Sequence, residues 1–259
     1  MAPIGPEVGA RPWSDEGRRR LWHWLRVDAA RLLWPSRCLV CDEPGLEGLD
    51  LCAACAAALP WNRCACPRCA LPLPAATECG DCLRREAALA QRGQAPALAG
   101  IHASFVYAAP LDRLLPRFKF HRDLAAGALL SQLMAEATTG LPRPDAIVPV
   151  PLHRARLRRR GYDQALELAR PLACALELPL RDDLLRRVRE TAAQSELDAV
   201  ARRRNLRGAF ALMPGAPVPD HVALVDDVMT TGATLHAAAA ALKQAGVRRV
   251  VAWVCARVP

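Results

Sequence analysis

The sequence predicts an α/β fold with a mainly parallel sheet, preceded by a small cysteine-rich module. Nine of the 11 cysteines lie between Cys38 and Cys82, whereas short apolar runs alternate with helical patterns from about residue 98 onward. Strands that are separated by helices require right-handed crossovers, which make neighbouring strands parallel. With 259 residues, of which 52% are hydrophobic, the chain can bury a core, and its composition excludes a disordered protein.

Residues 1–35 are expected to form an N-terminal arm and an amphipathic helix. Residues 18–34 repeat apolar side chains at i, i+3 and i+4 spacing, and Pro35 ends the pattern. A basic, tryptophan-bearing helix of this kind either packs on its own protein or makes a peripheral contact with a membrane surface. No stretch approaches the roughly 20 apolar residues of a membrane span, and no secretory signal is evident, so we expect a cytoplasmic protein.

Residues 36–90 contain four C-x-x-C pairs, and Cys64 is left over. Two thiolates on one tight turn can face the same metal ion, and two such turns complete a tetrahedral site. The simplest scheme is sequential and predicts a double zinc ribbon with two structural Zn²⁺ ions; a nested or crossed pairing stays open, and iron–sulfur is the minor alternative. The module is either purely structural or binds a partner or nucleic acid. The predicted metal ligands are Cys38, Cys41, Cys52, Cys55, Cys66, Cys69, Cys79 and Cys82.

After a linker at residues 91–97, the second predicted domain covers residues 98–259. Its apolar runs are short enough for buried strands, and the segments between them have helical periodicity. The expected strands are 101–107, 146–152, 223–228 and the final VRRVVAWVCARV segment, and the expected helices are 122–138, 162–177 and about 234–245.

Residues 222–234, VALVDDVMTTGAT, join an apolar strand to a helix through a loop of small residues. Gly232 permits close backbone approach, the loop amides and hydroxyls can surround a phosphate, and a helix N-terminus favours its charge. Asp226 and Asp227 can accept hydrogen bonds from a sugar diol. Open α/β sheets bind ligands at this position, beyond the carboxyl ends of their strands.

The same string resembles the 5-phosphoribosyl-1-pyrophosphate (PRPP) loop of type I phosphoribosyltransferases. The segments VPVPLHRARLRRRGYDQALELA and TAAQSELDAVARRRNLRGAF resemble the ComF/ComFC competence-protein family, also called the GntX type. That family pairs an N-terminal zinc ribbon with a domain of type I phosphoribosyltransferase fold, and the resemblance covers about residues 35–258. Asp163 stands where the family motif has Asn, and Cys64 is additional.

The resemblance implies specific roles for residues of this chain. Asp226 and Asp227 would act as catalytic residues that hold the ribose hydroxyls, the turn after residues 146–152 would be the pyrophosphate loop, and residues 191–205 would be a hood loop. Mg²⁺ would accompany PRPP. Related proteins bind PRPP without turnover, so enzymatic activity stays open. The implied PRPP-binding residues are Asp226, Asp227, Thr230, Thr231, Gly232, Ala233, Thr234, Leu152, His153 and Arg154.

The formal net charge is +9, and only two of the 35 basic residues are lysines. Five arginines within residues 154–160 exceed what one ligand needs, and arginine suits phosphate contacts. They either track the backbone of single-stranded DNA or form a solvated, self-paired basic face. The predicted nucleic-acid-binding residues are Arg156, Arg158, Arg159 and Arg160.

Three functions follow from these features. The first is a PRPP-binding, phosphoribosyltransferase-like protein that handles single-stranded DNA in natural transformation, with other DNA-uptake proteins as further partners. The second is a non-catalytic zinc and nucleic-acid adaptor, which would bind DNA regardless of Asp226 and Asp227. The third is a phosphoribosyltransferase or PRPP sensor of nucleotide metabolism, which would not bind DNA.

Overall fold

The computed structural model describes residues 35–189, 206, 208–213, 215 and 217–259. The predicted helix at 18–34 and the hood loop at 191–205 therefore lie outside the described residues. The chain divides into two compact units, residues 1–54 and residues 55–259, and the division falls inside helix α3 (Ala53–Ala57). The second cysteine cluster thus belongs to the same compact unit as the sheet.

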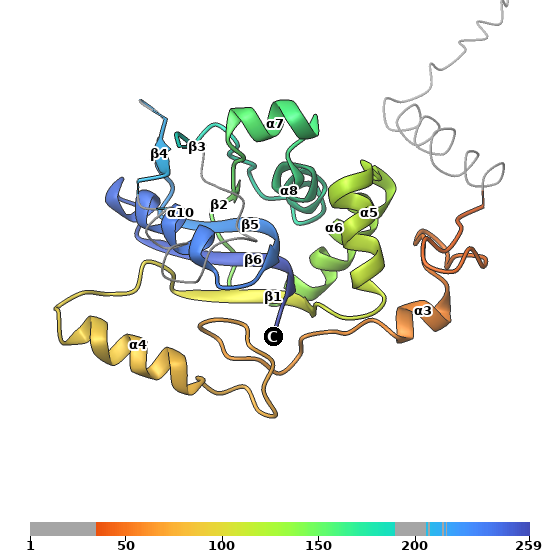
Figure 1. The fold of residues 1–259 in the computed structure, drawn as a ribbon, viewed down its shortest axis with the longest axis horizontal. Helices are drawn as coiled ribbons and strands as arrows, with labels where there is room; N and C mark the ends of the chain where they lie inside the picture. Colours follow the sequence, from red (N-terminus) through yellow and green to blue (C-terminus); the bar gives the residue numbers. More distant parts are fainter. Residues whose placement is uncertain (1–34, 190–205, 207, 214, 216) are drawn as a thin grey trace, which may run out of the picture. The chain divides into compact units, whose positions relative to one another are not determined.

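The larger unit is built on a four-stranded, entirely parallel sheet in the order β1-β6-β5-β2 (Figure 1). This arrangement confirms the predicted α/β class. A separate antiparallel pair joins β3 and β4. The strands are β1 (Gly100–Val106), β2 (Ala146–Pro149), β3 (Leu185–Arg187), β4 (Phe210–Leu212), β5 (His221–Met229) and β6 (Arg249–Arg257).

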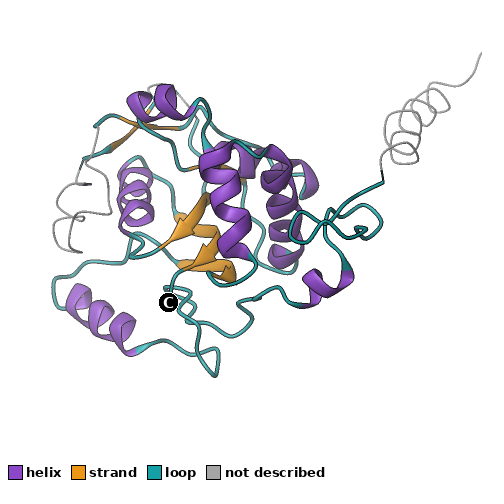
Figure 2. Cartoon of the chain, turned by 45° about the vertical axis from the view of Figure 1, so that its right-hand side comes forward, coloured by secondary structure: helices purple, strands orange, loops and turns teal. Residues whose placement is uncertain are grey.

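Helices cover both faces of this sheet, as Figure 2 shows. Helices α6 and α8 pack together on one face, and α10 packs on the other, beside β4. Buried apolar residues of the strands and α10 form a continuous core between these layers. Among the described helices, none combines the length and apolar character needed to cross a bilayer. The helices are α4 (Gly80–Ala90), α5 (Leu111–His121), α6 (Leu124–Thr138), α7 (Arg154–Arg160), α8 (Gln164–Ala175) and α10 (Ala233–Gln244).

Helix α6 starts two residues later than the sequence pattern indicated because Asp123 caps it. The Asp123 carboxylate accepts a hydrogen bond from the amide of Ala126 at 3.0 Å, which satisfies one of the free donors at the helix start. Helix α5 then packs closely on α6. A Cβ atom at Gly127 would lie 2.5 Å from the ring of Phe118, so this contact requires glycine.

Residues 60–67, which lead into the second cysteine cluster, cover the edge of strand β1. The amide of Asn62 donates to the carbonyl of Ser104 at 3.0 Å, and the amide of Ile101 donates to the carbonyl of Pro67 at 3.1 Å. An uncovered edge strand would expose unpaired backbone groups, so these bonds protect the sheet. They also explain why the second cysteine cluster and the sheet form one compact unit.

Candidate ligand site at the carboxyl ends of the strands

The end of β5 and the start of α10 form the segment in which the sequence predicts a phosphate-binding loop. Asp226 Oδ1 accepts the amide of Asp227 at 2.9 Å, and Asp227 Oδ1 accepts the amide of Val228 at 2.6 Å. Gly232 has a φ of 71°, and a Cβ atom there would lie 3.2 Å from the sulfur of Met229. Because any other residue would be strained at this φ, the turn depends on glycine.

This segment opens onto a cavity of about 120 Å³. The structure brings together in its lining all the loop residues that the sequence singled out, together with Leu152. His153 and Arg154 do not line it: the ring of His153 caps α7 by accepting the amide of Ala155 at 3.3 Å, and Arg154 is exposed. The lining comprises Lys119, Val150, Pro151, Leu152, Arg156, Arg160, Asp163, Gln164, Ala165, Arg187 and residues 226–235.

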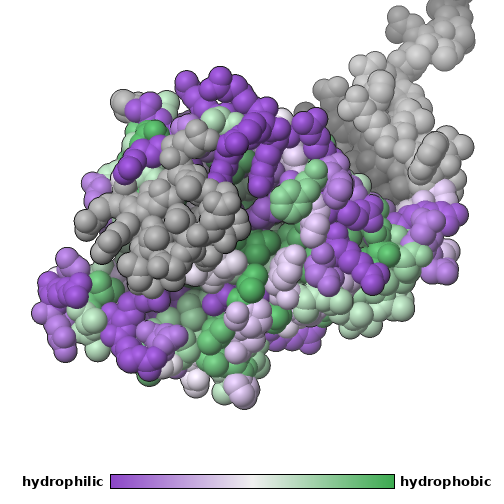
Figure 3. All heavy atoms as spheres, viewed as in Figure 1, coloured by the Kyte–Doolittle hydropathy of each residue, from purple (hydrophilic) through white to green (hydrophobic). Residues whose placement is uncertain are grey.

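Helix α7 divides the arginine cluster between two surfaces. Arg156 and Arg160 are four positions apart and therefore share one helix face, which lines the cavity. Arg158 and Arg159 lie on the exposed side of the helix, and the surface over α7 is strongly hydrophilic in Figure 3. Arg160 also donates to Gln164 Oε1 at 2.9 Å, which fixes its direction. The four arginines that the sequence grouped thus lie on two different surfaces of the helix.

Two further cations line the cavity, one on α5 and one on β3. The ammonium of Lys119, on α5, lies 2.8 Å from Asp227 Oδ2, and Asp227 is only 6% exposed. Arg187, on β3, is buried, and its guanidinium lies 5.5 Å from the ring centre of Phe210. Lys119 had no assigned role, and its only sequence signal was the scarcity of lysine in this chain.

The carboxylates of this site repel one another. Burial and the neighbouring charge of Asp227 raise the pKa of Asp226 to about 7; Asp163 adds to the effect, and Lys119 opposes it. The charged form of Asp226 is therefore costly at neutral pH. A ligand that donates hydrogen bonds to this carboxylate, or a cation, would favour the charged form.

Asp163 joins the loop after β2 to the start of α8. Its Oδ2 accepts the amide of Leu152 at 2.8 Å, and its Oδ1 accepts the amides of Ala165 and Leu166 at 3.0 and 3.3 Å. Burial nevertheless raises the pKa of this carboxyl. Asparagine has a single acceptor oxygen, so it could not make both sets of bonds. The aspartate that departs from the family motif thus positions Leu152, which lines the cavity.

The cavity therefore has an acidic side and a basic side. Carboxylates at the end of β5 suit hydroxyl groups, whereas the cations of α5, α7 and β3, together with the N-terminus of α10, suit phosphate groups. Such a site matches an anionic sugar phosphate better than an apolar ligand.

The eight paired cysteines form two clusters. In each cluster the four ligand atoms lie within 4.8 Å of one another, and the sulfurs of Cys69 and Cys79, like those of Cys41 and Cys52, are 3.6 Å apart. A tetrahedral zinc ion with Zn–S bonds of about 2.3 Å holds its sulfurs about 3.8 Å apart, so both clusters fit a structural zinc ion. Cys64 is exposed and belongs to neither. The grouping is sequential: Cys38, Cys41, Cys52 and Cys55, then Cys66, Cys69, Cys79 and Cys82.

Among the thiols of the second cluster, that of Cys66 is biased toward the thiolate form, whereas burial raises the pKa of Cys69 to about 11. The sulfur of Cys66 accepts the amide of Cys79 at 3.4 Å. Although burial opposes it, backbone hydrogen bonds from Cys79, Arg68 and Cys69 lower the pKa of Cys66 to about 7. Zinc binds the thiolate form of cysteine, so these bonds favour metal binding.

Comparisons with known proteins agree with this architecture. A double zinc ribbon domain matches residues 29–83, and a phosphoribosyl transferase domain matches residues 162–259. The DNA utilization protein YhgH of Salmonella typhi is 36% identical over 232 residues, which cover 86% of this chain and 97% of that protein. Competence protein F of Haemophilus influenzae is 36% identical over 190 residues, 70% of this chain and 79% of that protein.

Among solved structures, orotate phosphoribosyltransferase from Aeropyrum pernix is similar to 65% of this chain, with 22% sequence identity, a TM-score of 0.33 and coverage of 78% of that chain. The identity to YhgH extends over both the cysteine clusters and the sheet domain. The chain therefore belongs to the ComF/YhgH family, in which a double zinc ribbon precedes a type I phosphoribosyltransferase domain.

Proposed function

We propose that this protein binds PRPP at the carboxyl ends of β2 and β5 and handles single-stranded DNA during DNA uptake in the cytoplasm. The observation that carries the first part is the arrangement of Asp226 and Asp227 beside the Gly232 turn, with Lys119, Arg156 and Arg160 facing them across one cavity. The names of the relatives, which refer to DNA utilization and competence, support the second part.

In this proposal each side of the cavity takes one part of PRPP. Asp226 and Asp227 accept hydrogen bonds from the ribose hydroxyls, and residues 230–234 surround the 5-phosphate with amides and hydroxyls. The diphosphate lies toward Leu152 and the arginines of α7. Mg²⁺ would neutralise part of the charge of the diphosphate. This neutralisation would also make the diphosphate a better leaving group.

The exposed side of α7 provides the proposed DNA contact. Arg158 and Arg159 are exposed and do not line the cavity, so a phosphate backbone could approach this side of the helix while PRPP is bound. Contacts of this kind are electrostatic and insensitive to base sequence. The two ligands would therefore lie on opposite sides of one short helix.

Calorimetric titration of PRPP with Mg²⁺ tests the first part. Replacing both Asp226 and Asp227 by asparagine keeps the side-chain shape but removes charge-assisted hydrogen bonds, each of about 1.5–3 kcal/mol. We expect at least a tenfold loss of affinity, with unchanged zinc content. Asp112→Asn, an exposed aspartate in the first turn of α5, is the matched control. Unchanged affinity in the double variant would reject the site.

Single-stranded DNA added to the same samples separates the remaining functions. Turnover is measured as diphosphate release in the presence of candidate acceptor bases. PRPP binding without DNA binding would support an enzyme or sensor of nucleotide metabolism. DNA binding that persists in a protein unable to bind PRPP would support a zinc and nucleic-acid adaptor.

A further inference from the structure

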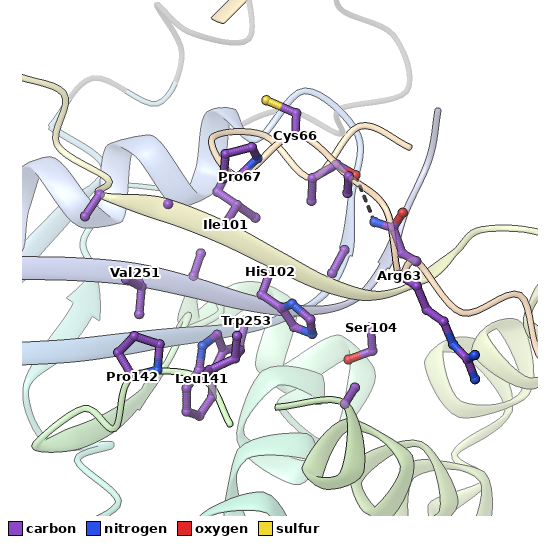
Figure 4. A pocket seen from close by; sticks show the side chains of 18 of the residues that line it. Arg63, Cys66, Pro67, Ile101, His102, Ser104, Leu141, Pro142, Val251 and Trp253 are labelled. Carbon is purple, nitrogen blue, oxygen red and sulfur yellow. Dashed lines mark hydrogen bonds between the residues drawn. The ribbon is translucent and has the colours of Figure 1, made fainter. Parts of the chain in front are cut away.

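A second and larger cavity, of about 670 Å³, lies at β1 and β6, away from the proposed PRPP site (Figure 4). The two cavities share no lining residue. Strands β1 and β6 contribute one wall, the end of α6 and the following turn contribute a second, and residues 61–67 contribute a third. The volume is in the range of cavities that hold small organic ligands.

Three buried polar atoms in the lining of this cavity have no hydrogen-bond partner among the described residues. They are Asn62 Oδ1, His102 Nε2 and Ser104 Oγ. Asn62 is 8% exposed and Ser104 is 3% exposed. Buried polar groups in proteins are almost always paired, so three unpaired groups in one cavity point to a ligand that completes them.

The hydrogen-bonding character of these groups is defined. The Nδ2 group of Asn62 donates to the carbonyl of Ala70 at 3.0 Å, so its Oδ1 can only accept. Burial lowers the pKa of His102, so its ring is neutral at physiological pH. The hydroxyl of Ser104 can donate or accept. The side chains of Asn62, His102 and Ser104 are therefore all neutral.

Most of the other lining residues are apolar. Trp253 is the register partner of His102 on the adjacent strand, and Figure 4 shows both rings facing the side on which Leu141 and Pro142 lie. Trp61 also lines the cavity. Aromatic surfaces beside neutral polar groups suit a planar heterocycle, whose faces stack and whose edges donate and accept hydrogen bonds.

Charged groups occur among the exposed lining residues. Arg63 and Arg249 are exposed arginines, and Glu136 is an exposed carboxylate. Their sum is one positive charge, which favours a ligand with an anionic group outside the neutral interior. A sugar phosphate alone would leave the interior groups unpaired, because the arginines lie at the exposed rim.

We propose that this cavity binds a nucleotide, with the base against Trp253, His102 and Ser104 and the phosphate at Arg63 and Arg249. The nucleotide is either a free mononucleotide or one unit of a single-stranded DNA whose base enters the cavity. In both cases the chemistry of recognition is the same. The site goes beyond the proposed PRPP function, since it uses other residues on another part of the sheet.

The first test is calorimetric titration with dAMP, dGMP, dCMP and dTMP. Replacing His102 by leucine and Ser104 by alanine removes two of the interior polar groups, and we expect at least a tenfold loss of affinity for the nucleotide that binds best. Ala137→Met fills the cavity from α6 without touching the polar groups and should have the same effect. Melting temperature and zinc content verify that each variant is folded.

The second test concerns the phosphate. Arg63→Gln with Arg249→Gln should weaken binding three- to tenfold and reduce its salt dependence. Arg170→Gln is the matched control, because Arg170 is an exposed arginine on α8 outside the cavity. This variant should change neither the affinity for the nucleotide nor its salt dependence. Anisotropy titration of a labelled 15-residue oligo-dT separates the two sources. Weaker oligonucleotide binding by the Ala137→Met variant identifies a base of DNA, and loss of mononucleotide binding alone identifies a free nucleotide.

Two results would overturn the proposal. One is that the parent protein binds none of the four nucleotides at millimolar concentration and that Ala137→Met leaves oligonucleotide binding unchanged; water would then occupy the cavity. The other is that nucleotide binding disappears when Asp226 and Asp227 are replaced but survives in the His102 and Ser104 variant. Titration of PRPP on the same samples reports on the first site independently, so failure of one proposal is distinct from failure of the other.

Discussion

Replacing Lys119 by methionine tests whether the ion pair between Lys119 and Asp227 stabilises the proposed PRPP site. The ammonium of Lys119 lies 2.8 Å from Asp227 Oδ2, and the two side chains are 28% and 9% exposed. Methionine keeps most of the apolar stem, so the variant removes the charge with little change in packing. Asp227 is then left as a buried carboxylate beside Asp226 without this cation.

The expected loss of stability follows from the burial of this pair. Removing one partner of a fully buried ion pair costs about 3–5 kcal/mol, whereas exposed pairs contribute less than about 1 kcal/mol. Because Lys119 is about one-quarter exposed, we expect about 1–3 kcal/mol at pH 7–8, measured by urea unfolding.

The same variant should change the pH dependence of PRPP binding. Lys119 lowers the pKa of Asp226, which stands at about 7, so its removal raises that pKa further. An acid is neutral below its pKa, so at pH 7 a smaller fraction of Asp226 is charged and PRPP affinity falls. The affinity should recover as the pH rises, with a midpoint above that of the parent protein.

Lys243→Met is the natural control, because Lys243 is the other lysine of the chain and makes an exposed contact with the carbonyl of Arg248. Lys243→Met should leave the pH midpoint of PRPP binding unchanged. Lys119→Arg keeps the positive charge and should have the midpoint of the parent protein. If Lys119→Met and Lys243→Met had the same stability and the same pH profile, the ion pair with Asp227 would have no role in the site.

Three further predictions can be checked on the same preparations. Metal analysis should find two zinc ions per chain; Cys66→Ser should lose one of them, whereas Cys64→Ser should lose none. Asp226→Asn should raise the melting temperature at pH 8 but not at pH 4, because it removes a carboxylate that is costly only when charged; equal effects at both pH values would contradict this reasoning. Replacing Arg158 and Arg159 by alanine should reduce the salt dependence of single-stranded DNA binding by about 1.4 in logarithmic slope without changing PRPP affinity, and an unchanged slope would remove α7 from the DNA contact.

Much of the fold could be predicted because local patterns coincide with the final structure. The parallel strands follow apolar runs, and the residues of the β5–α10 segment are contiguous in the sequence, so their common location needed no tertiary information. Helix α5 was missed although Leu111, Leu114, Leu115 and Phe118 have helical spacing and are all buried. Pro116 lies inside this helix and weakens the pattern, since proline is usually found at helix ends.

Which residues line the two cavities depends on tertiary contacts, and local sequence patterns do not indicate these contacts. Lys119 reaches Asp227 only because α5 packs on α6, and Arg187 reaches the cavity from β3. The division of the arginines of α7 follows from helical geometry, but only after the helix itself is known. His102 and Ser104 alternate along β1 in a pattern typical of a solvated strand face, and nothing local indicates that residues 61–67 would enclose them.

The position of the second cysteine cluster changes the role that zinc has in this protein. A separate module could lose its metal and unfold without consequence for the sheet. Here the residues that lead into the cluster cover the edge of β1, and the guanidinium of Arg257, at the end of β6, donates to the carbonyl of Cys69 at 3.2 Å. The same residues form one wall of the large cavity. Zinc bound at Cys66, Cys69, Cys79 and Cys82 would therefore stabilise the edge of the sheet and the proposed nucleotide site together, so loss of this ion should affect both.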